Sequence, residues 1–153
     1  MSLKLGFKVS ANWELNAFTE RKDLKTHRVS IVGKPDLTVS AAREFKGNPQ
    51  CYNPEDLLLS SLISCHMMSY FYLCDKHKVE ILSYSDTAEG ILEVNENGSG
   101  KFVEVVLFPR VIVKDKHQVA LAVELHEKAH ELCFIANSCN FEIKVCPTCE
   151  IKA

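Results

Sequence analysis

The longest apolar segment of the chain spans residues 53–74, which read NPEDLLLSSLISCHMMSYFYLC. Asn53 suits the N-cap of a helix, Pro54 suits the first helical position, and the two acidic residues that follow favour the positive end of a helix dipole. The remaining residues are hydrophobic on nearly all sides, which in a globular protein is typical of a helix buried on most faces. The pattern predicts a long central helix that starts at Asn53 and ends near residues 76–79.

The other hydrophobic patterns are those of strands and of one amphipathic helix. Alternating or β-branched runs predict strands at residues 6–13, 27–33, 37–41, 79–95, 101–114 and 141–145. Asn97-Gly98 is a good hairpin turn, and residues 117–132 have apolar positions at helical spacing. The order βββ-α-ββ-α-β predicts an α+β fold, with two antiparallel sheets around the central helix and a second helix, as one domain over residues 1–153.

Composition narrows the function classes. The 153 residues are 46% hydrophobic and 25% charged, with a formal net charge of −2 and no cluster of Lys or Arg, which gives no indication of a nucleic-acid partner. Five polar residues interrupt the apolar run at residues 57–74, which disfavours a membrane span. Seven cysteines without a secretory signal favour a reducing compartment, so we expect a cytoplasmic protein whose thiols are catalytic, metal-binding or inert.

Two of the cysteines are placed on the two strongest helical patterns. Cys65 lies in the middle of the apolar segment, beside Ser64 and His66, and Cys133 ends the second helix. A rigid helix can fix the position and the pKa of a thiol, and a second thiol within reach can close a catalytic disulfide. The default interpretation of a cysteine is a buried structural thiol, and we retain it for Cys51 and Cys74.

A carboxylate and an arginine could assist the helix thiol. Glu55 precedes Cys65 by ten residues on the same helix, roughly 15 Å along its axis. One long arginine could contact both groups and stabilise a thiolate, and the candidates are Arg21 and Arg43. Taken alone, Glu55 is explained as a first-turn residue that complements the helix dipole.

Two motifs suggest metal chemistry instead. His126-Glu127-Lys128-Ala129-His130 matches the zinc-protease pattern H-E-x-x-H, but Ala136 stands where the extended motif requires a third histidine. We therefore expect no bound metal, and we expect His126 and His130 at the surface or at a dimer contact. Cys146-Pro147-Thr148-Cys149 resembles half of a zinc ribbon or a redox pair, without a second pair nearby.

The combination of these residues resembles the OsmC/Ohr family, the osmotically induced proteins C and organic hydroperoxide resistance proteins. The resemblance covers essentially the whole chain and rests on Asn53-Pro54-Glu55, Ser64-Cys65-His66 and Ala129–Cys133. It implies an intertwined homodimer with active sites at the subunit interface, and a cysteine peroxidase without metal or flavin. It also implies that Cys65 is the peroxidatic thiol, Cys133 the resolving thiol, and Glu55 the carboxylate that orients an essential arginine, Arg21 or Arg43.

We therefore expect a thiol-dependent peroxidase that reduces organic hydroperoxides and is regenerated by an external dithiol. The sequence also fits a different class, an OsmC-like protein that binds a small apolar ligand or serves as a scaffold with little peroxidase activity. For the disulfide partner of Cys65, Cys133 is favoured, while Cys139 and the Cys146/Cys149 pair remain alternatives.

Overall fold

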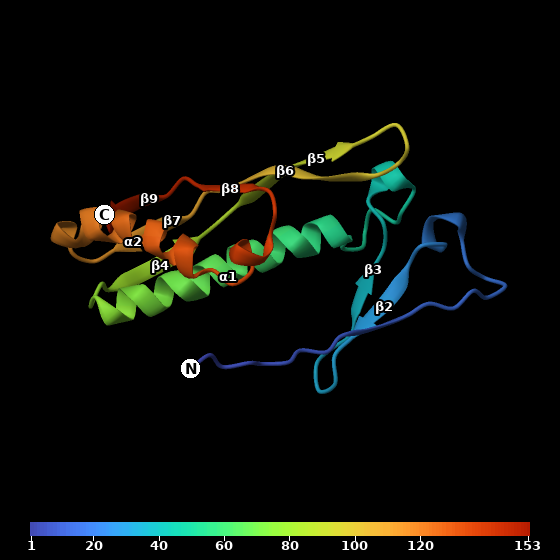
Figure 1. The fold of residues 1–153 in the computed structure, drawn as a ribbon, viewed down its shortest axis with the longest axis horizontal. Coiled ribbons are helices and arrows are strands. Elements are labelled where there is room, and N and C mark those ends of the chain that lie inside the picture. Colours follow the sequence, from blue (N-terminus) through green and yellow to red (C-terminus); the bar gives the residue numbers. More distant parts are fainter. The chain divides into compact units, whose positions relative to one another are not determined.

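The computed structural model describes residues 1–153, which form two compact units, residues 1–57 and 58–153 (Figure 1). In the first unit, three short strands pair antiparallel in the order β1-β2-β3. They span Ser10–Asn12, His27–Ser30 and Leu37–Val39, and two single-turn 3₁₀ helices follow β1 and β3, η1 at Arg21–Asp23 and η2 at Arg43–Phe45. The predicted single domain over residues 1–153 stays a prediction.

The long helix α1 spans Pro54–Lys76 and begins as its sequence predicts. The Asn53 side chain accepts a hydrogen bond from the Asp56 N–H at 2.8 Å. In turn, the Asp56 carboxylate accepts one from the Asn53 N–H at 3.3 Å. This reciprocal cap satisfies two backbone donors that a helix start leaves unpaired. The helix ends where Lys78 adopts a positive φ of 58°.

The second unit contains two three-stranded sheets, β4-β7-β9 and β5-β6-β8, and the helix α2. The elements are β4 (Ile81–Ser85), β5 (Ala88–Val94), β6 (Gly100–Leu107), β7 (Arg110–Val113), η3 (Lys116–Gln118), α2 (Val119–Leu132), η4 (Ala136–Ser138), β8 (Glu142–Val145) and β9 (Thr148–Ile151). The predicted α+β class with two principal helices is confirmed.

The strand pairing differs from the prediction in two respects. The predicted long strands 79–95 and 101–114 are each broken in two. At the breaks, Asp86 accepts hydrogen bonds from the Phe108 N–H and the Tyr84 hydroxyl. Pro109 also lacks the N–H that would continue the ladder. The sheets are mixed rather than antiparallel, since β8 pairs parallel to β6 and β9 parallel to β7. Parallel neighbours require a crossover, which α2 supplies.

Helix α1 contributes to two hydrophobic cores in the second unit. Its first half packs through Leu62 against Phe102, Val105 and Leu107 of β6. Its second half packs against β7 and α2, in a cluster whose buried members are Tyr70, Leu73, Cys74, Val79, Val111, Val113, Ala122, Leu125 and Ala129. Figure 1 shows α1 running along the strands of this unit.

Length and composition alone would allow α1 to cross a membrane, with a mean hydropathy of 1.4, although only 28% of its most apolar window is buried in the structure. Its packing into two cores is typical of the central helix of a folded domain. The faces of α1 that the single chain leaves uncovered are therefore available for contact with another surface.

A glycine in the first unit provides a test of the fold. A Cβ at Gly47 would overlap the carbonyl of Ala41, whereas one at Gly6 would meet nothing within 4 Å. Because a backbone carbonyl cannot move aside cheaply, we expect Gly47→Ala to lower the free energy of unfolding by about 2–3 kcal/mol. Thermal and urea unfolding measure the effect, with Gly6→Ala as a matched control of no effect. Equal stability of the two variants would contradict the placement of Gly47.

Candidate thiol site

The Cys65 thiol lies half-buried in the middle of α1. Residues three, four and seven positions further along a helix share its face, and these are Met68, Ser69 and Tyr72. Together with Leu132 and Phe134, which flank Cys133, they line a groove of about 370 Å³. A substrate that reaches Cys65 along this face would therefore contact a mainly hydrocarbon surface.

The Cys133 thiol lies directly after α2 and is buried, with 1% of the residue exposed. The pKa of this thiol is raised to about 11. Burial is the largest cause, the neighbouring Cys65 thiol also raises the pKa, and the Ala136 N–H, 3.5 Å from Sγ, lowers it. The structure thus brings Cys65 and Cys133 together, as free thiols, from two different helices. Cys65 is the more accessible of the two.

Three apolar residues of α1 close to Cys65 in the sequence have different surroundings. Met68 lines the groove, but Leu62 lies in the core against β6, and Phe71 lies edge-on to the ring of Tyr84. Phe71, six residues after Cys65, falls outside the i, i+3, i+4 spacing, whereas Leu62, three residues before Cys65, has this spacing and packs into the core.

Glu55 and the two candidate arginines all belong to the first unit. The Glu55 Oε2 atom is buried without a hydrogen-bond partner, and neither Arg21 nor Arg43 forms an ion pair with it in the single chain. A buried carboxylate oxygen that lacks a donor is costly. Glu55 is therefore a carboxylate with an open position for a cation.

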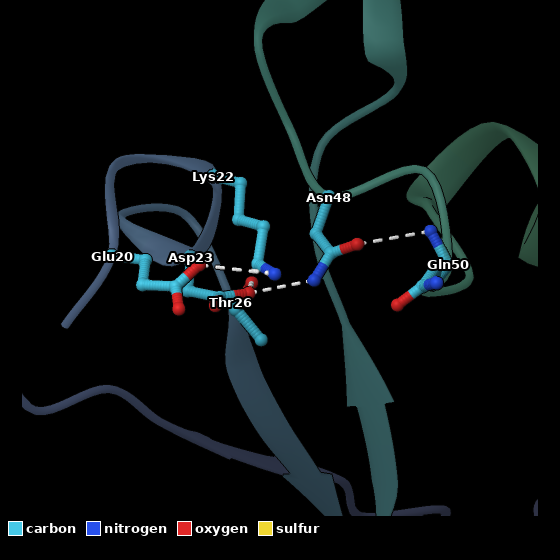
Figure 2. A network of polar contacts seen from close by, with 6 residues as sticks. All are labelled: Glu20, Lys22, Asp23, Thr26, Asn48 and Gln50. Carbon is cyan, nitrogen blue, oxygen red and sulfur yellow. Dashed lines mark hydrogen bonds and ion pairs between the residues drawn. The ribbon is translucent and has the colours of Figure 1, made fainter.

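A polar network fixes the 3₁₀ helix that carries Arg21. Asp23 accepts hydrogen bonds from the Asn48 side-chain amide at 2.7 Å and from the Thr26 hydroxyl at 3.2 Å, and Asn48 also accepts one from the Gln50 N–H (Figure 2). These bonds tie η1 to the segment that leads into α1. Arg43 lies on η2, which is held through its end by a 2.6 Å bond from the Lys25 ammonium to the Phe45 carbonyl.

One histidine of the H-E-x-x-H pattern, His126, lies elsewhere than predicted. His126, expected at the surface or at a dimer contact, is 1% exposed, and its Nδ1 lies 3.0 Å from Nε2 of the buried His66. Its ring stacks on Tyr70 at a centroid distance of 3.8 Å, while His130 is half-buried. The sequence carries a signal for this contact, because residues four positions apart share one face of a helix. His66 and Tyr70 have this spacing on α1, and Ala122 and His126 have it on α2.

No three residues of the kinds that ligate metals lie close enough together to hold an ion. Four other thiols of the second unit have different surroundings. Cys74 is buried in the core beside α2, and Cys149 packs against the same core. Cys139 packs on the other core and donates to the Ile135 carbonyl at 3.2 Å, while Cys146 is exposed.

The difference in burial predicts selective alkylation at neutral pH. Only thiolates react with iodoacetamide, and a thiol of pKa about 11 is ionised in about one molecule in ten thousand at pH 7. We expect Cys133 to remain unmodified in the folded protein while the exposed Cys146 is labelled. Peptide mass spectrometry measures both sites in one sample, and labelling of Cys133 as fast as Cys146 would contradict the burial of its thiol.

Comparison with known proteins places this arrangement in a family. Residues 47–147, which include α1, Cys65 and Cys133, match the family model OsmC, described as OsmC-like protein. The chain belongs to the OsmC family. This confirms the resemblance seen in the sequence.

Individual relatives of this OsmC-like chain share its length and fold. The uncharacterized protein YmaD of Bacillus subtilis (strain 168) is 26% identical over 135 residues, which cover 86% of this chain and 85% of YmaD. An OsmC-like protein of unknown function from Vibrio cholerae is 28% identical, with a TM-score of 0.80 over 92% of this chain and 97% of its own. An organic hydroperoxide resistance protein OsmC from Legionella pneumophila shares the fold at 20% identity, with a TM-score of 0.69 over 98% of this chain and 100% of its own.

Proposed function

We propose that this OsmC-like protein is a thiol-dependent peroxidase that reduces organic hydroperoxides to alcohols. The observation that carries the proposal is the pairing of an accessible thiol, Cys65, with an adjacent buried thiol, Cys133. An accessible thiol is suited to attack a substrate, and a buried thiol of raised pKa is suited to wait as a protonated partner. Family membership supports a redox or peroxidase-related role.

The proposed cycle balances with two thiols and one hydroperoxide. The Cys65 thiolate attacks the distal peroxide oxygen, the O–O bond breaks, and the alkoxide leaves and takes a proton to become the alcohol. The sulfur of Cys133 then attacks the Cys65 sulfenic acid, a disulfide forms, and the hydroxyl group leaves as water. An external dithiol reduces the disulfide by thiol exchange. The cycle uses no metal or other cofactor.

The groove that begins three residues after Cys65 on α1 supports a preference for organic hydroperoxides over hydrogen peroxide. Its walls are the side chains of Met68, Tyr72, Leu132 and Phe134. Each methylene of an alkyl chain that is buried there contributes about 0.8 kcal/mol, which hydrogen peroxide cannot gain. Two of the solved structures with the same fold are named as organic hydroperoxide resistance proteins, from Legionella pneumophila and Elizabethkingia anophelis.

Glu55 and one arginine would assist the attack. A guanidinium that binds the open carboxylate oxygen of Glu55 would be held in a fixed orientation, and its positive charge would stabilise a nearby thiolate. We propose Arg21 for this role, because Asp23 and Asn48 fix its short helix to the segment that precedes Glu55. Arg43 is the alternative.

We propose that the protein functions as a homodimer in the cytoplasm. The N-terminal segment supports this assembly, since Leu3, Leu5, Phe7 and Val9 alternate with polar residues or glycine and are all strongly exposed in the single chain. A row of exposed apolar side chains of this kind favours contact with a partner surface. Sedimentation at micromolar concentration tests the dimer, and a stable monomer would contradict it.

Trapping of the intermediate tests the peroxidase proposal. After one equivalent of cumene hydroperoxide in the presence of dimedone, we expect the dimedone adduct on Cys65. Without dimedone, peptide mapping should recover a Cys65–Cys133 disulfide. Absence of the adduct, with a small apolar molecule retained in native mass spectra, would contradict the peroxidase proposal and support a ligand-binding protein. A Cys65–Cys139 disulfide with Cys133 free would reject Cys133 as the resolving thiol.

A further inference from the structure

Three histidines with unpaired nitrogens are grouped where α2 packs on α1. Nε2 of His66 lies 3.0 Å from Nδ1 of His126, and His130 lies close to His66, since it adds to the effect of burial in lowering the pKa of that ring. The remaining nitrogens His66 Nδ1, His126 Nε2 and His130 Nδ1 are buried and make no hydrogen bond. Buried polar atoms are nearly always paired, so three unpaired nitrogens in one cluster indicate a partner from outside the chain.

Two of these histidines, His126 and His130, line a cavity of about 380 Å³ beside α2. The other lining residues belong to α2, to the end of β8 and to the turn that follows, and they are Val123, Glu124, Glu127, Val145 and Pro147. His126 is only 1% exposed, and because His66 engages its Nδ1, Nε2 is the free nitrogen of this ring. The cavity thus combines unpaired imidazole nitrogens with acidic and apolar side chains.

The charged side chains of the cavity are all acidic. Glu124 and Glu127 are exposed, and neither forms an ion pair. No lysine or arginine lines the cavity, and Lys128, the next residue along α2, pairs with Glu131. A concave surface lined by charges of one sign attracts ions of the opposite sign. The cavity therefore favours a cation and disfavours an anion.

The hydrogen bond between the two rings limits what His126 can offer to a ligand. Burial is the main cause that lowers the pKa of His66 to about 4 and that of His126 to about 3, so both rings are neutral at pH 7. A neutral imidazole has one N–H and one acceptor nitrogen. When the shared proton is on His126 Nδ1, Nε2 of that ring is an acceptor, and when it is on His66 Nε2, His126 Nε2 is a donor. A ligand that only donates hydrogen bonds selects the first arrangement.

We propose that this cavity binds a small primary ammonium ion that carries a short alkyl chain. An ammonium group has three N–H donors, which match the free nitrogens of His126 and His130 and the carboxylate of Glu127. The alkyl chain contacts the apolar side of the cavity at Val145 and Pro147. The site uses neither Cys65 nor Cys133, so the proposal is independent of the peroxidase cycle.

An organic cation fits this cavity better than a metal ion does. No three metal-ligating residues lie close enough together to hold an ion. A hydrogen bond to an ammonium spans about 2.7–3.2 Å, whereas a zinc–nitrogen bond spans about 2.0–2.1 Å, so an ammonium accepts a wider spacing of its partners. A bare metal ion would also leave the apolar surface of Val145 and Pro147 unused.

Three probes of equal chain length test the charge of the ligand. n-Butylammonium, n-butanol and butyrate differ only in an end group that is positive, neutral or negative. In NMR titrations at neutral pH we expect n-butylammonium to bind about tenfold more tightly than n-butanol, because two carboxylates face its charge, and we expect butyrate not to bind. Absence of n-butylammonium binding, or equal binding of either other probe, would overturn the proposal.

The tautomer of His126 reports whether the probe reaches the free nitrogen. In ¹⁵N NMR of the wild-type protein, n-butylammonium should move the shift of His126 Nε2 toward that of a bare nitrogen and that of Nδ1 toward that of a protonated one. The shared proton then resides on His126. Movement of Nε2 in the opposite direction, or no change in this ring at saturating probe, would overturn the proposal.

Matched substitutions test the position of the site. Glu127→Gln keeps the size of an exposed side chain and should weaken n-butylammonium binding roughly fivefold. His126→Phe keeps a ring against Tyr70 but lacks the free nitrogen, and it should abolish binding. Glu93→Gln makes the same change of charge at an exposed position of β5 and is the control of no effect. Wild-type affinity in Glu127→Gln, or equal weakening in Glu93→Gln, would overturn the proposal even if His126→Phe fails to fold.

Discussion

Cys65→Ser is expected to abolish turnover of cumene hydroperoxide, with no reaction above the rate of the free peroxide. A serine hydroxyl keeps the size of the side chain but provides no thiolate, and the sulfenic acid that starts the cycle cannot form. Because Cys65 is half-buried on a helix surface, the substitution should leave thermal stability nearly unchanged. Coupled consumption of a dithiol measures turnover. Equal consumption by wild type and variant would reject the proposed mechanism.

Two further cysteine variants separate the roles of the thiols. Cys133→Ser should consume one equivalent of peroxide and then stop, because the sulfenic acid on Cys65 has no adjacent thiol. Cys146→Ser should turn over at the wild-type rate, since the Cys146 thiol is exposed on the β8–β9 turn. Loss of turnover in Cys146→Ser would instead indicate that the Cys146/Cys149 pair transfers electrons to the site.

The features that local sequence determines were predictable. Asn53, Pro54 and the acidic first turn define the start of α1, and the structure confirms it because a helix cap depends on residues only a few positions apart. The positions of Cys65 and Cys133 on two separate helices were predictable for the same reason. Their contact was expected from the family resemblance rather than from spacing.

The features that depend on the path of the chain were not predictable. The H-E-x-x-H spacing places His126 and His130 on one helix face, but only the packing of α2 on α1 decides that His126 is buried against His66. The strand β9 was missed because Thr148–Ile151 is short and lacks a clear alternation. Its parallel pairing with β7 arises from a crossover that no local pattern reveals.

Substitution of Glu55 or of its proposed arginine partner is also expected to lower activity strongly. Glu55→Gln and Arg21→Ala should each lower kcat/KM for cumene hydroperoxide by about 100-fold, because each removes one member of a pair that stabilises developing negative charge. The double variant should lose no more than either single variant, since the two residues act as a unit. Arg43→Ala is the matched control and should retain activity, because Arg21 is the proposed partner of Glu55.

The same set of single and double variants also distinguishes Arg21 from Arg43 as the partner of Glu55. Loss of activity in Arg43→Ala, with Arg21→Ala unaffected, would transfer the role to Arg43 without changing the role of Glu55. Additive losses in Glu55→Gln and Arg21→Ala would show that the two residues act independently, and the buried Oε2 of Glu55 would then need another donor. A carboxylate oxygen that folding buries without a partner is costly unless another group reaches it.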